Sequence, residues 1–282
     1  MRATAVRRTA LAACAVSLTL LATACGGSSD TEAEGGKADK GGATSGSSSA
    51  PKSSAPTDSA PKTSVKALSA AELEAVSLKQ GDVAGHEITK AGPDDELPEG
   101  GVTVDKAACL PVAHAMYGVA QKGSAATTKR KVLSEPKKAD TKKPAGELTD
   151  GDVEDVLKAA FDVTSSFVAL NAYEGTAGPE TFVALKKAAA DCAGGFTATV
   201  SGEPQKVVSV TEEKATGGDE SAAWKLTVVD DGDDRFPISL VALRKESTVA
   251  TFYSINVAAV TGRNAKSTGP TEVVAAQAKK LG

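Results

Sequence analysis

Apolar residues are distributed unevenly along the 282-residue chain. Residues 9–24 form an uncharged and mostly apolar run, whereas residues 26–64 contain no Val, Ile, Leu, Met, Phe, Tyr or Trp. Regularly spaced apolar positions begin near Leu68 and continue to the C-terminus. The pattern predicts three parts, which are a leader at 1–24, a tether at 25–65 and a folded domain at 66–282.

The segment after the leader is rich in Gly, Ser, Ala, Thr, Pro and Lys, with repeated Ser-Ala-Pro triplets. Such a composition buries too little apolar surface to offset the entropy of ordering, so we expect a disordered tether. A flexible chain of this length spans roughly 35 Å.

Helix signals mark both ends of the folded part. Ser69-Ala70-Ala71-Glu72 is a capping box, which predicts a helix running to about Leu78. A short strand is expected at 86–89, and Pro111 favours a second helix start. Near the C-terminus, a helix beginning at about Pro270 directs Val273, Val274, Gln277 and Leu281 inward.

The region after Asp150 predicts a compact α+β unit. Apolar residues at helical spacing in 152–160 and 180–192 predict two helices, the second ending at Gly194-Gly195. Alternating or apolar runs predict the strands 161–173, 196–200, 207–210, 224–228, 236–243 and 249–257. Because the connections are short, we expect a twisted antiparallel sheet of about five to seven strands packed by helices.

Cys25 follows a signal of arginines, apolar residues and small residues. That order predicts export and cleavage before the cysteine. The sequence Leu21-Ala22-Thr23-Ala24-Cys25 resembles a bacterial lipobox, which implies lipidation of Cys25 with diacylglyceryl and palmitate-type chains and anchoring to the outer side of the cytoplasmic membrane. Leu11-Ala12-Ala13-Cys14 also matches the box, but cleavage there would leave too short an apolar core.

Cys109 and Cys192 are the cysteines that remain. Two cysteines in an exported chain are expected to form a disulfide. Two free thiols or a metal site are the alternatives, but there is no C-x-x-C motif, and His86 and His114 lack ligand spacing.

Charge limits the partners. The net charge is −4, and residues 1–24 contain three arginines and no acid, so the mature chain carries about −7. This balance argues against nucleic acid as a partner. Residues 121–147 are locally basic, with eight lysines and arginines. We interpret them as a solvated loop or hairpin around a strand at 127–133, and contact with anionic cell-wall polymers or lipid headgroups is the alternative.

Catalytic and cofactor motifs are absent from the sequence: it has no G-x-S-x-G, no P-loop and no G-x-G-x-x-G. We therefore predict a non-enzyme without a cofactor, metal or catalytic residue. His114 is expected to be structural or exposed. The cluster Asp230–Asp234 is interpreted as a hairpin tip, with Ca²⁺ binding as the alternative. Trp224 is expected in the core, and Tyr173, Phe252 and Tyr253 are candidates to line a cleft.

Short motifs in 66–282 resemble the PknH-like extracellular sensor domain of actinobacterial lipoproteins and receptor kinases. They are Asp82-Val83-Ala84-Gly85, Ser166-Phe167, Ala188-Ala189-Ala190-Asp191-Cys192, Gly218-Asp219-Glu220-Ser221, Val241-Ala242-Leu243-Arg244 and Val273-Val274-Ala275-Ala276-Gln277. The resemblance implies a twisted antiparallel sheet with helices and a cleft for a small ligand.

Three functional hypotheses follow. The first is a lipid-anchored binding or sensor-like module with an apolar cleft and no catalysis. The second is a carrier of a lipid or hydrophobic metabolite, which requires a cavity deep enough for acyl chains. The third is a cell-wall hydrolase, which requires carboxylates or a histidine converging in a groove.

Overall fold

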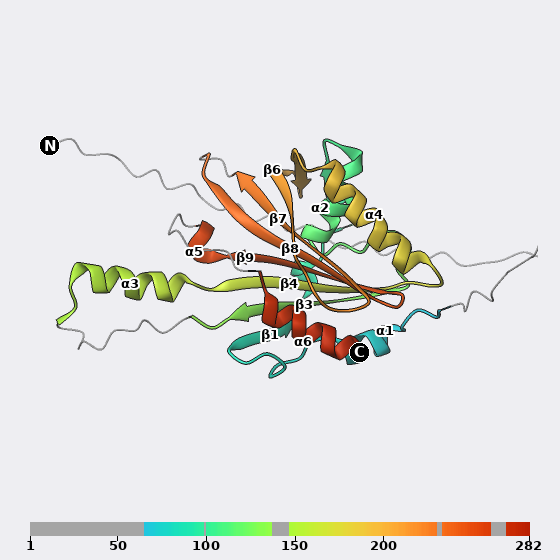
Figure 1. Cartoon of the computed structure of the whole chain (residues 1–282), viewed down its shortest axis with the longest axis horizontal. Helices are drawn as coiled ribbons and strands as arrows, with labels where there is room; N and C mark the ends of the chain where they lie inside the picture. The colour runs from blue at the N-terminus through green and yellow to red at the C-terminus, as the bar shows by residue number, and fades with distance from the viewer. Residues whose placement is uncertain (1–64, 99, 137–146, 230–232, 261–268) are drawn as a thin grey trace, which may run out of the picture. The chain divides into compact units, whose positions relative to one another are not determined.

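The computed structural model describes residues 65–98, 100–136, 147–229, 233–260 and 269–282. These residues form an α+β fold on a single antiparallel sheet with the strand order β1-β3-β4-β9-β8-β7-β6-β5-β2 (Figure 1). The strands are β1 (His86–Lys90), β2 (Val102–Val104), β3 (Ala126–Ser134), β4 (Thr164–Ala172), β5 (Phe196–Val200), β6 (Glu203–Glu213), β7 (Glu220–Val229), β8 (Arg235–Lys245) and β9 (Thr248–Asn256).

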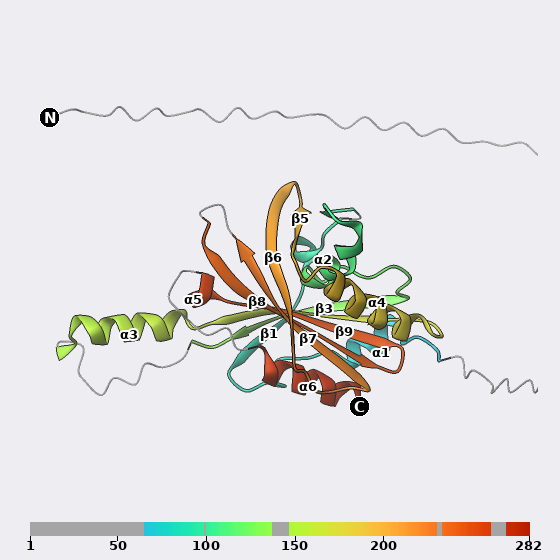
Figure 2. The same cartoon turned by 45° about the horizontal axis from the view of Figure 1, so that its top comes forward.

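Helices cover both faces of this sheet. The α-helices are α1 (Ala70–Val76), α2 (Leu110–Met116), α3 (Asp150–Phe161), α4 (Ala177–Asp191), α5 (Val257–Val260) and α6 (Thr271–Leu281), and the 3₁₀ helices are η1 (Pro93–Asp95) and η2 (Ala107–Cys109). Figure 2 shows α2 and α4 on one face, and α1 and α6 on the other. α3 extends away from the sheet in both views.

The predicted fold class is confirmed, but the sheet is larger than predicted. Nine strands form among the described residues, where five to seven were expected. β2 was missed because three residues are too short for an alternating pattern to stand out. Pairing with β5, in which Val102 lies opposite Val200, makes this short segment a strand.

Each face of the sheet has its own apolar core. Phe182, Leu185 and Trp224 pack between the sheet and the α2–α4 side, which confirms Trp224 as a core residue. Leu73 and Phe252 belong to the second core, which lies on the α1–α6 side. Successive residues of a strand point to opposite faces, so each strand supplies side chains to both cores.

The predicted disulfide between Cys109 and Cys192 is present, with Cα atoms 5.8 Å apart and 83 positions of sequence between them. Cys109 ends η2, and Cys192 is the C-cap residue of α4. Three residues later, Gly195 has φ +86°, and a Cβ there would collide with the Val207 carbonyl oxygen. The bridge fixes α2 against α4, so the first half of the domain covers one face of the second.

The strand predicted at 127–133 in the basic stretch is present as β3, but the stretch is not solvated throughout. β3 lies between β1 and β4, and Lys129 and Arg130 are buried there. The Lys129 Nζ lies 2.6 Å from Glu96 Oε2. A buried cation needs such a partner, and acidic residues distant in sequence supply one. Residues 137–146 of this stretch lie outside the described part of the chain.

Candidate functional site

A polar cleft lies where α6 begins, over the ends of β1, β3 and β4. Its volume is about 320 Å³. The lining residues are Ala84, Gly85, His86, Ser134, Glu135, Asp162, Thr164, Ser166, Gly269, Pro270, Thr271, Glu272 and Val273. Hydroxyls and carboxylates dominate this surface, so it suits a small hydrogen-bonding ligand. The binding hypothesis predicted an apolar cleft, and this one differs in polarity.

Polar side chains hold the strand ends that form the cleft. Ser134 Oγ accepts a hydrogen bond from the Thr164 N–H at 2.8 Å. The Asn256 amide donates to Asp162 Oδ1 at 2.8 Å, and His86 Nδ1 lies 2.9 Å from the Ala84 carbonyl oxygen. None of these bonds uses the carboxylates of Glu135 and Glu272, which also line the cleft.

The start of α6 adds backbone donors to this wall. Pro270 is the N-cap residue of α6, and no side chain within the described part of the chain makes a capping bond to it. The first N–H groups of an α-helix have no partner within the helix, and they carry partial positive charge. The N–H of Thr271 donates to the Gly269 carbonyl at 2.8 Å, so the N–H groups of Glu272 and Val273 are the helix donors beside the carboxylates of the cleft.

A row of three serines supports the segment Gly269–Thr271. Ser166 on β4, Ser254 on β9 and Ser239 on β8 lie opposite one another in register, and all are buried. The Ser166 and Ser254 hydroxyl oxygens are 2.7 Å apart. A Cβ on Gly269 would lie 3.0 Å from Ser239 Oγ. Any larger residue at this position would therefore press against the serine row.

A second cleft, of about 240 Å³, lies on the other side of the same segment. It is called the mixed cleft here. Ala215, Ala223, Val241 and Val274 form its apolar wall, and its polar groups are on Glu213, Lys214, Thr216, Ser239 and Thr271. Gly269, Pro270 and Thr271 line both clefts. The position of α6 thus determines the shape of both.

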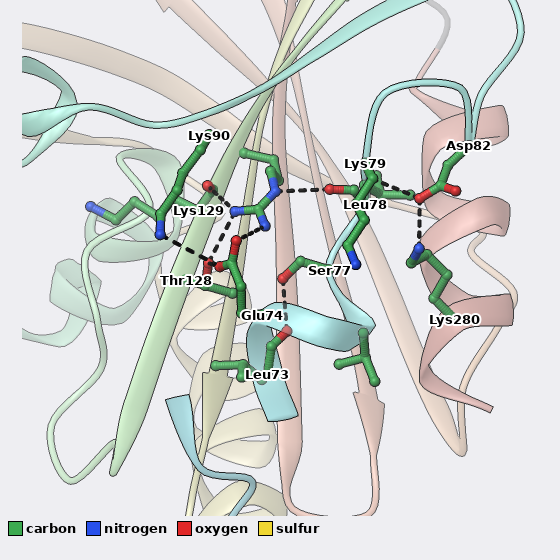
Figure 3. A network of polar contacts seen from close by, with 12 residues as sticks. Leu73, Glu74, Ser77, Leu78, Lys79, Asp82, Lys90, Thr128, Lys129 and Lys280 are labelled. Atoms are coloured by element: carbon green, nitrogen blue, oxygen red, sulfur yellow. Dashed lines mark hydrogen bonds and ion pairs between the residues drawn. The ribbon is translucent and has the colours of Figure 1, made fainter. Parts of the chain in front are cut away.

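α6 is held against the first helix of the domain. The Gln277 side chain is completely buried, accepts from the Leu78 N–H at 3.2 Å and donates to the Val76 carbonyl at 2.8 Å. Lys280 Nζ donates to Asp82 Oδ2 at 2.7 Å (Figure 3). This bond, with a backbone bond from Lys79, holds the pKa of Asp82 below its usual value.

α1 is in turn bound to β3 by an ion pair between Glu74, which is partly exposed, and the buried Arg130 (Figure 3). Arg130 Nη2 lies 2.6 Å from Glu74 Oε1, and Arg130 Nε donates to the Leu78 carbonyl at 2.8 Å. Thr128 Oγ1 donates to the other Glu74 oxygen at 2.8 Å. Burial by itself would raise the pKa of Glu74, but the bonds from Thr128 and Arg130 outweigh it and lower that pKa.

On the opposite face, Tyr117 and Tyr253 stack with ring centroids 6.4 Å apart. Burial raises the pKa of both, to about 12 for Tyr253. The Tyr117 hydroxyl donates to Gln205 Oε1. His114 is half-buried on α2, which lowers its pKa.

The other candidates from the sequence do not converge on one site. Tyr173 and Phe252 are fully buried core residues rather than cleft residues. Of the two histidines, His86 lines the polar cleft, whereas His114 lies on α2. Cys25 and residues 230–232 of the Asp230–Asp234 cluster lie outside the described residues. Within the described ranges, no three His, Cys, Asp or Glu residues are grouped so that they could hold a metal.

The functional residues that the sequence did not reveal come from distant segments. Glu135, Asp162 and Glu272 belong to no recognisable motif in the chain, and only the sheet order brings them to one cleft. No helix in the described part of the chain has the length and apolar character needed to span a bilayer.

No family model matches this chain, and no curated protein matches it either. A solved structure is similar. It is the extracellular domain of PknH from Mycobacterium tuberculosis, with 13% sequence identity, a TM-score of 0.45, and coverage of 77% of this chain and 97% of that one. At this level of similarity, the comparison assigns neither a family nor a ligand to the chain.

Proposed function

We propose that this chain is a lipid-anchored, extracytoplasmic binding protein that holds a small polar ligand without chemically changing it. The observation that carries the binding part is the polar cleft, in which helix N–H groups, hydroxyls and carboxylates surround about 320 Å³. Sites for drug-sized ligands are roughly 300–1,000 Å³. The volume therefore suits a ligand of the size of a sugar or an amino acid.

The anchoring part rests on the N-terminal sequence. Cys25 follows an export signal that resembles a lipobox, and a diacylglyceryl group on it would hold the chain on the outer side of the cytoplasmic membrane. The Cys109–Cys192 disulfide supports this location, because such bridges persist in oxidising compartments. Residues 26–64 would then act as the tether between the membrane and the domain.

The two alternatives need features that these clefts do not favour. A lipid carrier needs an apolar cavity large enough for acyl chains, whereas the mixed cleft holds about 240 Å³ and the larger cleft is polar. A hydrolase needs converging carboxylates or a histidine, and in the polar cleft Asp162 already accepts from Asn256, so only Glu135 or Glu272 could supply the carboxylate. Binding of a small polar ligand is the function that the geometry supports best.

Native mass spectrometry of the complete mature chain tests the binding proposal. We expect the purified protein to carry a small polar compound that denaturation releases, and we expect occupancy to fall at least several-fold in Glu135→Leu. Glu180→Leu on α4 is the matched control, because it removes a carboxylate on the opposite face. A ligand with acyl chains would favour the carrier, and a clean unliganded mass in every preparation would contradict binding.

Intact-mass analysis of the membrane-extracted chain tests anchoring separately. We expect residues 1–24 to be absent and the mass of a lipid to be added. Cys25→Ser should abolish incorporation of a palmitate analogue, and Cys14→Ser should leave it unchanged. Incorporation that persists in Cys25→Ser would overturn the assignment of the anchor.

A further inference from the structure

The mixed cleft has the form of a binding site that the proposed function does not use. Ala223 on β7, with Ser239 and Val241 on β8, lies at its base, and all three are buried. One side is formed by residues 213–216, at the end of β6 and just after it, and the other by the start of α6. The cleft is therefore built by three segments that are distant in sequence.

The Ser239 hydroxyl at the base of the cleft has no protein partner. Ser239 is 5% exposed, and its side chain makes no hydrogen bond within the described part of the chain. Its neighbours in the serine row differ, since Ser166 and Ser254 bond to each other at 2.7 Å. The Ser239 Oγ points toward Gly269, which borders the cleft. A buried hydroxyl without a partner costs free energy, and a ligand in the cleft would supply the missing bond.

The charges around the cleft favour an anionic ligand. Lys214 lines the cleft, and Lys225 lies directly opposite Ser239 in the β7–β8 register, so its side chain projects from the same face of the sheet. Both lysines are exposed, and neither forms an ion pair with a described residue. Glu213 is the one acidic residue among the described residues that line the cleft. The N-terminal end of α6 adds partial positive charge.

The apolar wall limits the size and shape of the rest of the ligand. The volume of about 240 Å³ equals that of roughly eight water molecules in the liquid. Ser239 and Val241 project from the same face of β8 and are about 6.7 Å apart along the strand. A ligand with its charged group at Ser239 would therefore place a body of about five carbons against Val241 and Val274. A long acyl chain exceeds this volume.

We infer that the mixed cleft binds a small branched monocarboxylic acid. One carboxylate oxygen accepts a hydrogen bond from the Ser239 hydroxyl, and the charge lies within reach of Lys214 and Lys225. The hydrocarbon body lies against Val241 and Val274. This site goes beyond the proposed function, because it does not depend on a ligand in the polar cleft.

An NMR titration of the complete mature chain, with Cys25→Ser to keep it free of lipid, tests the site with isocaproate as the probe. We expect saturable shifts of the Ala215, Val241 and Val274 amide signals, with a dissociation constant on the order of 1 mM. Isocaproamide has the same shape without the charge and should bind several-fold more weakly. No saturation at about 20 mM isocaproate, equal binding of the acid and the amide, or shifts centred on Glu135 would overturn the inference.

Substitutions in the serine row separate binding from folding. Ser239→Ala should weaken isocaproate binding several-fold without lowering the free energy of unfolding, because the hydroxyl that it removes has no protein partner. Ser254→Ala is the matched control in the same row. It should lower the free energy of unfolding, since it breaks the bond to Ser166, and leave isocaproate binding unchanged. Unchanged binding in Ser239→Ala would contradict the inference.

Substitutions at the rim test the charge and the space separately. Lys214→Gln should reduce the preference for isocaproate over isocaproamide several-fold, whereas Lys206→Gln, near the other end of β6, should not. Ala275→Leu should block the cleft from an exposed position on α6 and abolish binding of both compounds. Circular dichroism checks that each variant is folded. An unchanged preference in Lys214→Gln, or full binding in Ala275→Leu, would place the acid elsewhere and contradict the site.

Discussion

α1 and α3 begin in the same way and end in different surroundings. Both have a capping box, formed by Ser69 with Glu72 in α1 and by Thr149 with Asp152 in α3. α1 has only seven residues, yet it buries Leu73 and contributes Glu74 to an ion pair with the buried Arg130. α3 has twelve residues and buries none. Capping determines where a helix starts, but its contribution to the stability of the fold depends on the surface that it meets.

The largest expected difference concerns one leucine on each helix. Leu73→Ala should lower the free energy of unfolding by about 3 kcal/mol, because Leu73 is fully buried and its removal leaves a cavity. Leu157→Ala should change it by less than about 0.5 kcal/mol, since that side chain is exposed. Urea unfolding of dilute protein measures both. Equal losses in the two variants would show that α3 is part of the core.

A smaller difference is expected between the ion pairs of the two helices, which are Glu74–Arg130 in α1 and Glu154–Lys158 in α3. Glu74→Gln should cost about 2 kcal/mol, because it leaves the buried Arg130 guanidinium without its charged partner. Glu154 pairs with Lys158 at 2.9 Å on an exposed helix surface, so Glu154→Gln should cost about 0.3 kcal/mol. Chemical denaturation at pH 7 distinguishes these values, and a similar cost for both would contradict the importance of burial.

The pH dependence of unfolding gives a second test of the Glu74–Arg130 ion pair. The pKa of Glu74 is lowered in the folded state, so its stabilisation is present above the unfolded pKa, near 4.5, and is lost as the pH falls through the folded value. The difference in stability between wild type and Glu74→Gln should therefore be constant at neutral pH and shrink in acid. A difference that grows in acid would assign the lowered pKa to another group.

A smaller loss than at Leu73 or Glu74 is expected at the two caps. Ser69→Ala and Thr149→Ala should each weaken their own helix by about 1 kcal/mol. In α1 the loss should appear in global unfolding, whereas in α3 it should appear only as faster amide hydrogen exchange within the helix. Hydrogen exchange followed residue by residue checks this. Urea unfolding of both variants is the control, because only Ser69→Ala should lower the free energy of global unfolding.

Local signals explain what the sequence could predict. The Ser69 capping box, the inward residues of α6 and the pairing of Cys109 with Cys192 were predicted from short-range or compositional features, and the structure confirms them. The burial of Arg130 could not be predicted, because its partner Glu74 is 56 residues away and nothing near either residue indicates the pairing. The strand in the basic stretch was predicted, but its cations were expected in solvent, because the local sequence does not indicate that β3 has a neighbour on each side.

The candidate site was harder to predict than the fold. The polar cleft depends on the ends of three strands and the start of α6, and residues such as Ser134 and Asp162 are ordinary surface residues in sequence terms. Lipidation of Cys25 stays a prediction from the leader, as does the tether.

The Gln277 amide has a consequence for the order in which the chain can fold. It bonds the Leu78 N–H, 199 positions earlier, so the polar backbone after α1 gains its buried partner only when the last helix has arrived. A chain that folds as it is made, from the N-terminus onwards, must leave this part of the domain incomplete until the last helix has been added. Loss of the last few residues would remove Gln277 and leave the buried Leu78 N–H without this partner.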